Sequence, residues 1–167
     1  MQTNISIDEF RAFTNDSALA ATLFSKHKNN KLIVGFNFWA FIFHFSWFFF
    51  KRMHLTGLIA FLFFIYSFYA GIVLLNFLMF NVFAFEQKWI VQYGFLLCLL
   101  PPMAMTGFFA NNVLYWKALK VIGTARVLYV EQDERMSFIR SRGGESYLSA
   151  WLSVVAVYAL NEIGRLF

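Results

Sequence analysis

The stretch FNFWAFIFHFSWFFFKRM, residues 36–53, decides the topology of this chain of 167 residues. Ten of the fifteen residues from Phe36 to Phe50 are Phe or Trp, and Lys51 and Arg52 follow them directly. Such a segment can cross a bilayer, lie along one surface of it, or fill the core of a soluble domain. Composition and charge discriminate among these three possibilities.

Composition argues against the soluble possibility. Hydrophobic residues make up 60% of the chain and charged residues 14%, against about 25% charged residues in an ordinary soluble domain. A domain of this size cannot hide so much apolar surface from water, so we expect one small all-α membrane domain. The net charge of +5 favours anionic lipid headgroups as partners over nucleic acid.

The two ends of the chain are expected to form amphipathic helices. Residues 1–31 are polar, and Ser6 and Glu9 have the spacing of a capping box. Residues 117–167 begin with a basic, mixed segment and end in a predicted helix that starts at Tyr147. The apolar centre of that helix is too short to span a bilayer alone, so we expect it to lie at the interface or to pack against other helices.

Between these ends, residues 32–116 form the predicted membrane domain. The domain contains three apolar stretches, at 32–50, 55–85 and 89–116, and a spanning helix needs about 20 residues. As one helix the middle stretch would reach about 46 Å, which exceeds the hydrocarbon core of about 30 Å. It must therefore tilt, protrude or break. The candidate break points are Gly71, Asn76 and Asn81.

The distribution of Lys and Arg favours two full crossings, because cytoplasmic segments carry the excess of these residues. If all three apolar stretches cross from an inside N-terminus, the six basic residues at 117–142 fall outside, against this rule. If the stretch at 32–50 enters and leaves on one side, only the short turn at 86–88 lies outside. We therefore predict a two-crossing helical hairpin preceded by an interfacial or re-entrant aromatic helix. A plain spanning helix at 32–50 remains the alternative.

The aromatic segment itself agrees with an interfacial position. On a single helix, Asn37, His44 and Lys51 recur every seven positions and share one face. Trp favours the headgroup boundary, and basic residues there bind anionic lipid. The predicted lipid-anchoring residues are Lys51, Arg52, Trp39 and Trp47.

Small residues, prolines and amides mark predicted contacts within the membrane domain. Ser67 and Gly71 have a small-xxx-small spacing, and Gly107 offers a matching face for helix packing. Pro101 and Pro102 remove backbone hydrogen bonds and predict a kink. Polar side chains at membrane depth are expected to hydrogen-bond between helices rather than line a pathway. These side chains belong to Asn37, His44, Asn76, Asn111 and Asn112.

Three motifs resemble a known family. The run at 36–53 is similar to a signature with an Asn-Trp-Ala-Phe-Phe core, a later Trp and an aromatic-Arg-Lys-Met ending, although this chain inserts Phe38. The stretches GFFANNVLYWKAL at 107–119 and RGGES at 142–146 resemble two further elements. The family comprises small bacterial membrane proteins catalogued as domain of unknown function 2628. The resemblance implies an inner-membrane location and brings no activity with it.

Enzyme chemistry has little support in the sequence. The chain has no HExxH, CxxC, glycine-rich phosphate loop or nucleophile elbow, and no paired carboxylates within its apolar stretches. The charges at 123–145 nearly balance, which argues against a nucleic-acid patch and predicts a solvated helix face. We expect no catalytic residue, no metal site and no cofactor.

The predicted function is therefore a non-catalytic structural or accessory subunit that docks a partner or its own copies. Its predicted location is the bacterial inner membrane, with both termini in the cytoplasm. The alternative is an oligomeric pore or a membrane-perturbing effector.

Overall fold

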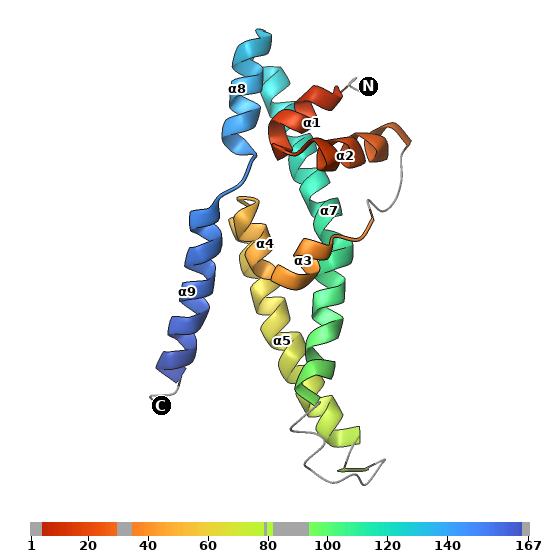
Figure 1. Cartoon of the computed structure of the whole chain (residues 1–167), viewed down its shortest axis with the longest axis vertical. Helices are drawn as coiled ribbons and strands as arrows, with labels where there is room; N and C mark the ends of the chain where they lie inside the picture. The colour runs from red at the N-terminus through yellow and green to blue at the C-terminus, as the bar shows by residue number, and fades with distance from the viewer. Residues whose placement is uncertain (1–4, 30–34, 79, 82–93, 165–167) are drawn as a thin grey trace.

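The computed structural model describes residues 5–29, 35–78, 80–81 and 94–164, and every regular element within these ranges is helical (Figure 1). This agrees with the predicted all-α class. The elements are α1 Ile7–Thr14, α2 Ser17–Asn29, α3 Phe38–Phe43, α4 Phe45–Phe50, α5 His54–Leu78, α7 Phe95–Leu128, α8 Gln132–Arg142 and α9 Tyr147–Gly164.

Helices α5 and α7 lie side by side along the long axis of the molecule (Figure 1). Two segments, His54–Leu78 and Leu97–Leu128, are long and apolar enough to cross a membrane. Of the candidate break points, Gly71 and Asn76 do not interrupt the helix, because α5 continues through both residues. Instead, Gly71 allows α5 and α7 to approach each other closely. A Cβ placed on Gly71 would lie 3.1 Å from the Sγ atom of Cys98 on α7.

The predicted boundary between residues 116 and 117 lies inside a continuous helix, since α7 runs on to Leu128. Ala118, Ile122 and Ala125 follow one another at helical spacing, and each is 0% exposed. Helices α1 and α8 pack against this part of α7. The apolar stripe therefore explains why the helix persists after the sequence turns basic.

Helices α1, α2 and α8 and the C-terminal end of α7 form a bundle at one end of the hairpin, which we call the head (Figure 1). The predicted capping box of α1 is confirmed, because Ser6 Oγ accepts from Glu9 N–H and the Glu9 carboxylate accepts from Ser6 N–H. Asp16 caps α2 by accepting from two backbone N–H groups. The largest fully buried apolar side chains of the head are Phe10, Phe13, Leu23, Ile122 and Ile139.

Glu9 is the polar centre of the head and is only 1% exposed. The Arg126 guanidinium donates to both carboxylate oxygens, at 2.8 Å and 2.6 Å, and Arg135 Nε lies 3.6 Å from Oε1. Burial by itself raises the pKa of Glu9, but the hydrogen bonds and charge of Arg126 outweigh it, so the pKa lies below its ordinary value of 4.5. The predicted solvated face is thus wrong for these two arginines, which join α7 and α8 to α1.

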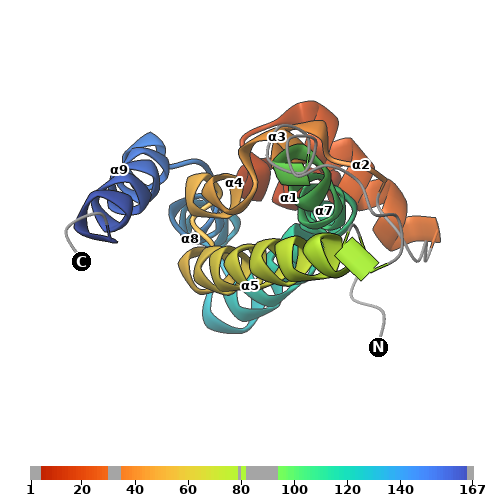
Figure 2. The ribbon, with the colours of Figure 1, turned by 90° about the horizontal axis from the view of Figure 1, so that it is seen from below.

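The Gly143–Gly144 pair ends α8 with Gly143 as the C-cap, and glycine is a common signal for the end of a helix. Gly144 N–H donates to the Phe13 carbonyl at 2.7 Å, and a side chain on Gly143 would collide with that carbonyl. The chain therefore turns tightly against the end of α1. Helix α9 then leaves the head and runs beside α4 on one flank of the hairpin (Figures 1 and 2).

The Glu9 cluster generates a stability prediction. Glu9→Gln leaves two arginines without a carboxylate partner and should destabilise the head by about 3–5 kcal/mol. The matched control is Asp8→Asn, which removes an exposed ion pair with Arg11 and should cost under about 1 kcal/mol. Thermal unfolding in mild detergent measures both variants.

The same cluster predicts a pH dependence with a definite sign. Because the folded-state pKa of Glu9 is lowered, its contribution is present above pH 4.5 and is lost as the pH falls through the lowered value. Wild type should therefore lose stability in acid more steeply than Glu9→Gln does. Equal acid sensitivity, or equal destabilisation by the Glu9 and Asp8 variants, would contradict the assignment.

Candidate functional site

The aromatic segment forms two short helices, and the expectation of a single helix is wrong. Helices α3 and α4 meet at His44, whose φ of 57° and ψ of −131° interrupt the helix. Glycine favours this backbone region, so a histidine there stores strain. As a result, α3 lies across the hairpin and α4 runs back toward the head (Figure 1). Asn37, His44 and Lys51 are the N-cap, the junction and the C-cap of the pair.

Asn37 fixes the entry of this segment on the middle of α7. Its N–H donates to the Gly107 carbonyl at 2.8 Å, and its Oδ1 accepts from Ala40 N–H at 2.8 Å to cap α3. Its Nδ2 donates to Asn111 Oδ1 at 2.7 Å. Two of the predicted intramembrane amides therefore meet, although they lie far apart in sequence. Gly107 makes room for the start of the segment, since a Cβ on Gly107 would be 2.5 Å from the Phe36 ring.

Lys51 fixes the return of the segment at the head end. Its Nζ lies 2.6 Å from Glu145 Oε1, just before α9, and its side chain is only 6% exposed. The Lys117 ammonium of α7 donates to the carbonyls of Lys51 and Arg52, where the end of α4 favours a positive charge. Lys51 thus has a protein carboxylate as its partner, where the sequence predicts a lipid phosphate. Arg52 is exposed and donates to the Ser141 carbonyl.

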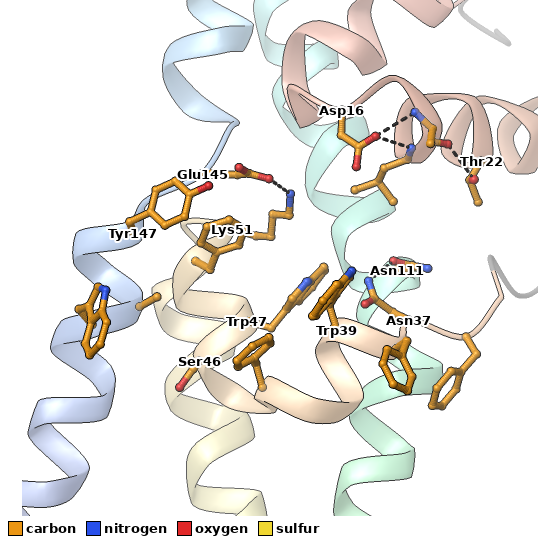
Figure 3. Close-up of a pocket in the computed structure, with 18 of the residues that line it drawn as sticks. Asp16, Thr22, Asn37, Trp39, Ser46, Trp47, Lys51, Asn111, Glu145 and Tyr147 are labelled. Carbon is orange, nitrogen blue, oxygen red and sulfur yellow. Dashed lines mark hydrogen bonds and ion pairs between the residues drawn. The ribbon is translucent and has the colours of Figure 1, made fainter.

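These contacts border a half-open cavity of about 1010 Å³ between α2, α3, α4 and the start of α9, which we call the aromatic groove (Figure 3). One wall carries Trp39, Phe43 and Trp47 from α3 and α4. Tyr147 and Trp151 of α9 line the groove as well. Its charged lining residues are Asp16, Lys51 and Glu145.

The contact between α4 and α9 has polar residues inside and apolar residues outside. Ser153 Oγ donates to Ser46 Oγ at 3.2 Å, and these residues are 8% and 9% exposed. Most of the large apolar side chains of α9 are exposed, and two of them, Trp151 and Val154, also line the groove. The exposed ones are Leu148, Trp151, Leu152, Val154, Val155 and Tyr158. This order is the reverse of that in a water-soluble helix.

His44 is 7% exposed, and neither ring nitrogen has a hydrogen-bond partner among the described residues. Its ring packs edge-on against Phe64 of α5, with the ring centroids 4.5 Å apart. Of the two predicted anchoring tryptophans, Trp39 is 61% exposed and Trp47 only 5%. Trp47 therefore serves packing, while Trp39 stacks on Phe43 and stays largely exposed, and both tryptophans line the groove.

The remaining predicted residues lie outside the groove. Gly71 faces Cys98 and Gly107 faces Phe36 and Phe41, so the two glycine regions do not pack on each other within the chain. Pro101 and Pro102 lie inside α7, as expected. Asn112 accepts from the Lys26 ammonium at 2.6 Å and so ties α7 to α2. Ser67 and Asn76 are half-buried on α5.

Sequence reasoning missed Glu145, Lys117 and Ser153 as parts of the site. Glu145 carried a usable signal, because it is an isolated carboxylate between a Gly-Gly turn and an apolar helix. Ser153 carried a weaker one, as a small polar residue within that apolar helix. The partners of both lie about a hundred positions away, so local patterns do not reveal the pairing.

The chemistry of the site is that of an apolar groove with a charged end. Among the described residues, no group of three or more His, Cys, Asp or Glu side chains could hold a metal ion. Comparison with known proteins yields no family model, curated protein or solved structure that matches the chain. The site is therefore interpreted from its own geometry.

Gly107→Ala tests the docking of the aromatic segment on α7. The added methyl group would press on the Phe36 ring and on Phe41, and overpacking of this kind costs about 1–3 kcal/mol. The matched control is Gly123→Ala on the same helix, where nothing lies within 4 Å. That change should be neutral or should stabilise the helix by up to about 1 kcal/mol. Equal melting temperatures for the two variants would refute this docking contact.

Proposed function

We propose that this chain is a non-catalytic accessory subunit of the bacterial inner membrane that docks onto a membrane partner or onto its own copies through α5. The observation that carries the proposal is the exposure of Tyr66 and Tyr69, which are 77% and 64% exposed at the midpoint of α5. In hydrocarbon, a tyrosine hydroxyl without a hydrogen-bond partner is costly. A neighbouring protein helix supplies such a partner, and lipid tails do not.

The exposed residues of α5 also form a seam suited to helix packing. Seven of its exposed large side chains recur at intervals of three and four residues, which is the spacing of two helices crossing at a shallow angle. They are Leu55, Ile59, Leu62, Tyr66, Tyr69, Val73 and Phe77. The seam runs along most of α5 and gives a partner helix a continuous surface.

Membrane placement is supported by the inverted contact between α4 and α9. Serine pairs inside and apolar side chains outside are favourable only where the surroundings are apolar. An interfacial helix needs a polar face, and the exposed side chains of α9 between residues 147 and 158 are mostly apolar. In this proposal α9 enters the lipid beside the hairpin, and residues 36–53 form a re-entrant wedge whose ends both lie on the cytoplasmic side with the head.

A structural role is supported by what the charged groups do. Glu9 binds Arg126, Lys51 binds Glu145, and Lys26 binds Asn112, and each contact joins elements distant in sequence. Buried ionisable groups in an active site are poised for substrate, whereas these are engaged in holding helices together. The runner-up role is a membrane-perturbing effector. The positions of α3 and α4 favour this effector role, because these helices widen the hairpin only in the half that lies next to the head (Figure 1).

The double variant Tyr66→Phe, Tyr69→Phe tests the proposal by removing only the two hydroxyl groups. Each lost interhelical hydrogen bond should weaken association by about 0.6–2 kcal/mol. The matched control is Tyr147→Phe at the start of α9, beside the head, where the hydroxyl is exposed to a similar degree. Native mass spectrometry from mild detergent measures the outcome and separates multiples of 19.5 kDa from a complex with another protein.

Wild type should appear as an oligomer or a heterocomplex, and the Tyr66, Tyr69 variant should dissociate at lower detergent concentration than Tyr147→Phe. A monomeric wild type in both detergent and cross-linked native membranes would overturn the docking role.

A further inference from the structure

The bend at His44 conflicts with the local sequence. Residues 37–51 contain neither glycine nor proline, and as one helix they would place Asn37, His44 and Lys51 on a single face. The structure instead divides them into α3 and α4, with His44 at φ 57° and ψ −131° (Figure 1). A local preference that the fold overrides is expected at functional or strained positions.

The side chain of His44 is also unsatisfied in the bent segment. It is 7% exposed, and neither Nδ1 nor Nε2 has a hydrogen-bond partner among the described residues. Its ring packs edge-on against the apolar ring of Phe64 on α5. A buried polar group without a partner costs free energy, as does a non-glycine residue in this backbone region. The bend therefore carries two costs at the same residue.

Contacts at the two ends of the segment hold the bend in place. Asn37 binds Asn111 of α7 at one end, and Lys51 binds Glu145 at the other. The Lys51 end is also joined to α5 through residues 51–53. The Asn37 end is attached to α7 by hydrogen bonds and side-chain packing alone. The Asn37 end is therefore the one that can be released while the hairpin stays intact.

We propose that residues 37–51 are a two-position element. In the bent position His44 lies at the turn of the re-entrant wedge. In the straight position Asn37 leaves α7, and the segment forms one helix at the cytoplasmic interface. Straightening returns His44 to helical dihedral angles and places its ring on the same face as Asn37 and Lys51. Headgroups and water then supply its hydrogen-bond partners.

This inference rests on the membrane placement proposed above, because only an interface provides apolar and polar surroundings on opposite faces of the straight helix. The bent position predominates, since both ends of the segment are engaged there. The contact between Asn37 and Asn111 thus controls how deeply the aromatic segment enters the membrane.

The distance between spin labels at Phe38 and Arg52 distinguishes the two positions. Both residues are exposed, and Cys98→Ala removes the native thiol. In one helix their Cα atoms lie about 21 Å apart, at about 1.5 Å per residue, and the bend brings them closer together. Pulsed electron spin resonance on the full chain in vesicles of phosphatidylethanolamine and phosphatidylglycerol measures this distance. Wild type should give mainly the shorter one.

Asn111→Ala removes an anchor without changing the segment itself. It should raise the long-distance fraction about three- to thirtyfold, the effect of one interhelical hydrogen bond in a membrane. The matched control is Asn112→Ala, the next residue of α7, which binds Lys26 of α2 rather than the segment. That variant should keep the wild-type fraction.

His44→Gly tests the strain separately, because glycine adopts the bent backbone freely and weakens a continuous helix. Added to Asn111→Ala, it should return the long-distance fraction to near the wild-type value. Ala40→Gly should not reverse the change, since Ala40 lies inside α3 and stays helical in both positions.

Three results would overturn the two-position element. They are a short distance alone in the Asn111 variant, a broad distribution without a peak near the helical distance, and a long-distance fraction that His44→Gly leaves unchanged. Resistance of the chain to carbonate extraction tests membrane placement independently. A membrane-bound chain that gives only the short distance in every variant therefore refutes this inference and leaves the proposed function standing.

Discussion

The ion pair between Lys51 and Glu145 is the contact on which the rest of the arrangement depends. It joins the end of α4 to the start of α9, and Lys117 of α7 binds the carbonyls at the same point. Removing one partner of a buried ion pair is expensive, because the other charge is left without compensation. The pair therefore specifies that the aromatic segment returns to the head end. Once it returns there, α5 must begin at the head, and α9 must lie beside α4.

The second constraint is the docking of Asn37 on α7. One amide side chain caps α3 and binds Asn111, while its backbone N–H binds the Gly107 carbonyl. Together with Lys51 it holds both ends of a wedge that turns sharply at the strained residue His44. The wedge and α9 enclose the aromatic groove, and the head is locked separately around Glu9. The same two contacts thus fix the position of the aromatic segment on the hairpin and the shape of the aromatic groove.

Local features of this fold were predictable from sequence, and long-range pairings were not. The capping box at Ser6 and the helix end at Gly143 depend on neighbouring residues, so their patterns are sufficient. The helix break at His44 could not be predicted, because no Gly or Pro marks it in the sequence. Tertiary contacts impose this break. The extension of α7 is hard to predict because the sequence turns basic at Lys117, although the apolar stripe of Ala118 and Ile122 continues past that point. The sequence favours lipid as the partner of Lys51 because its carboxylate partner lies 94 positions away.

The depth of the aromatic segment in a bilayer tests the re-entrant wedge most directly. Spin labels on single cysteines at Phe43 and Arg52, in a Cys98→Ala background, are compared by oxygen and nickel-complex accessibility in oriented vesicles. The wedge predicts that Phe43 is deep in the hydrocarbon and that Arg52 is shallow, on the same face as a label at Gln132 in the head. An Arg52 label on the face opposite to Gln132 would mean that the segment crosses the membrane, which would contradict the re-entrant wedge.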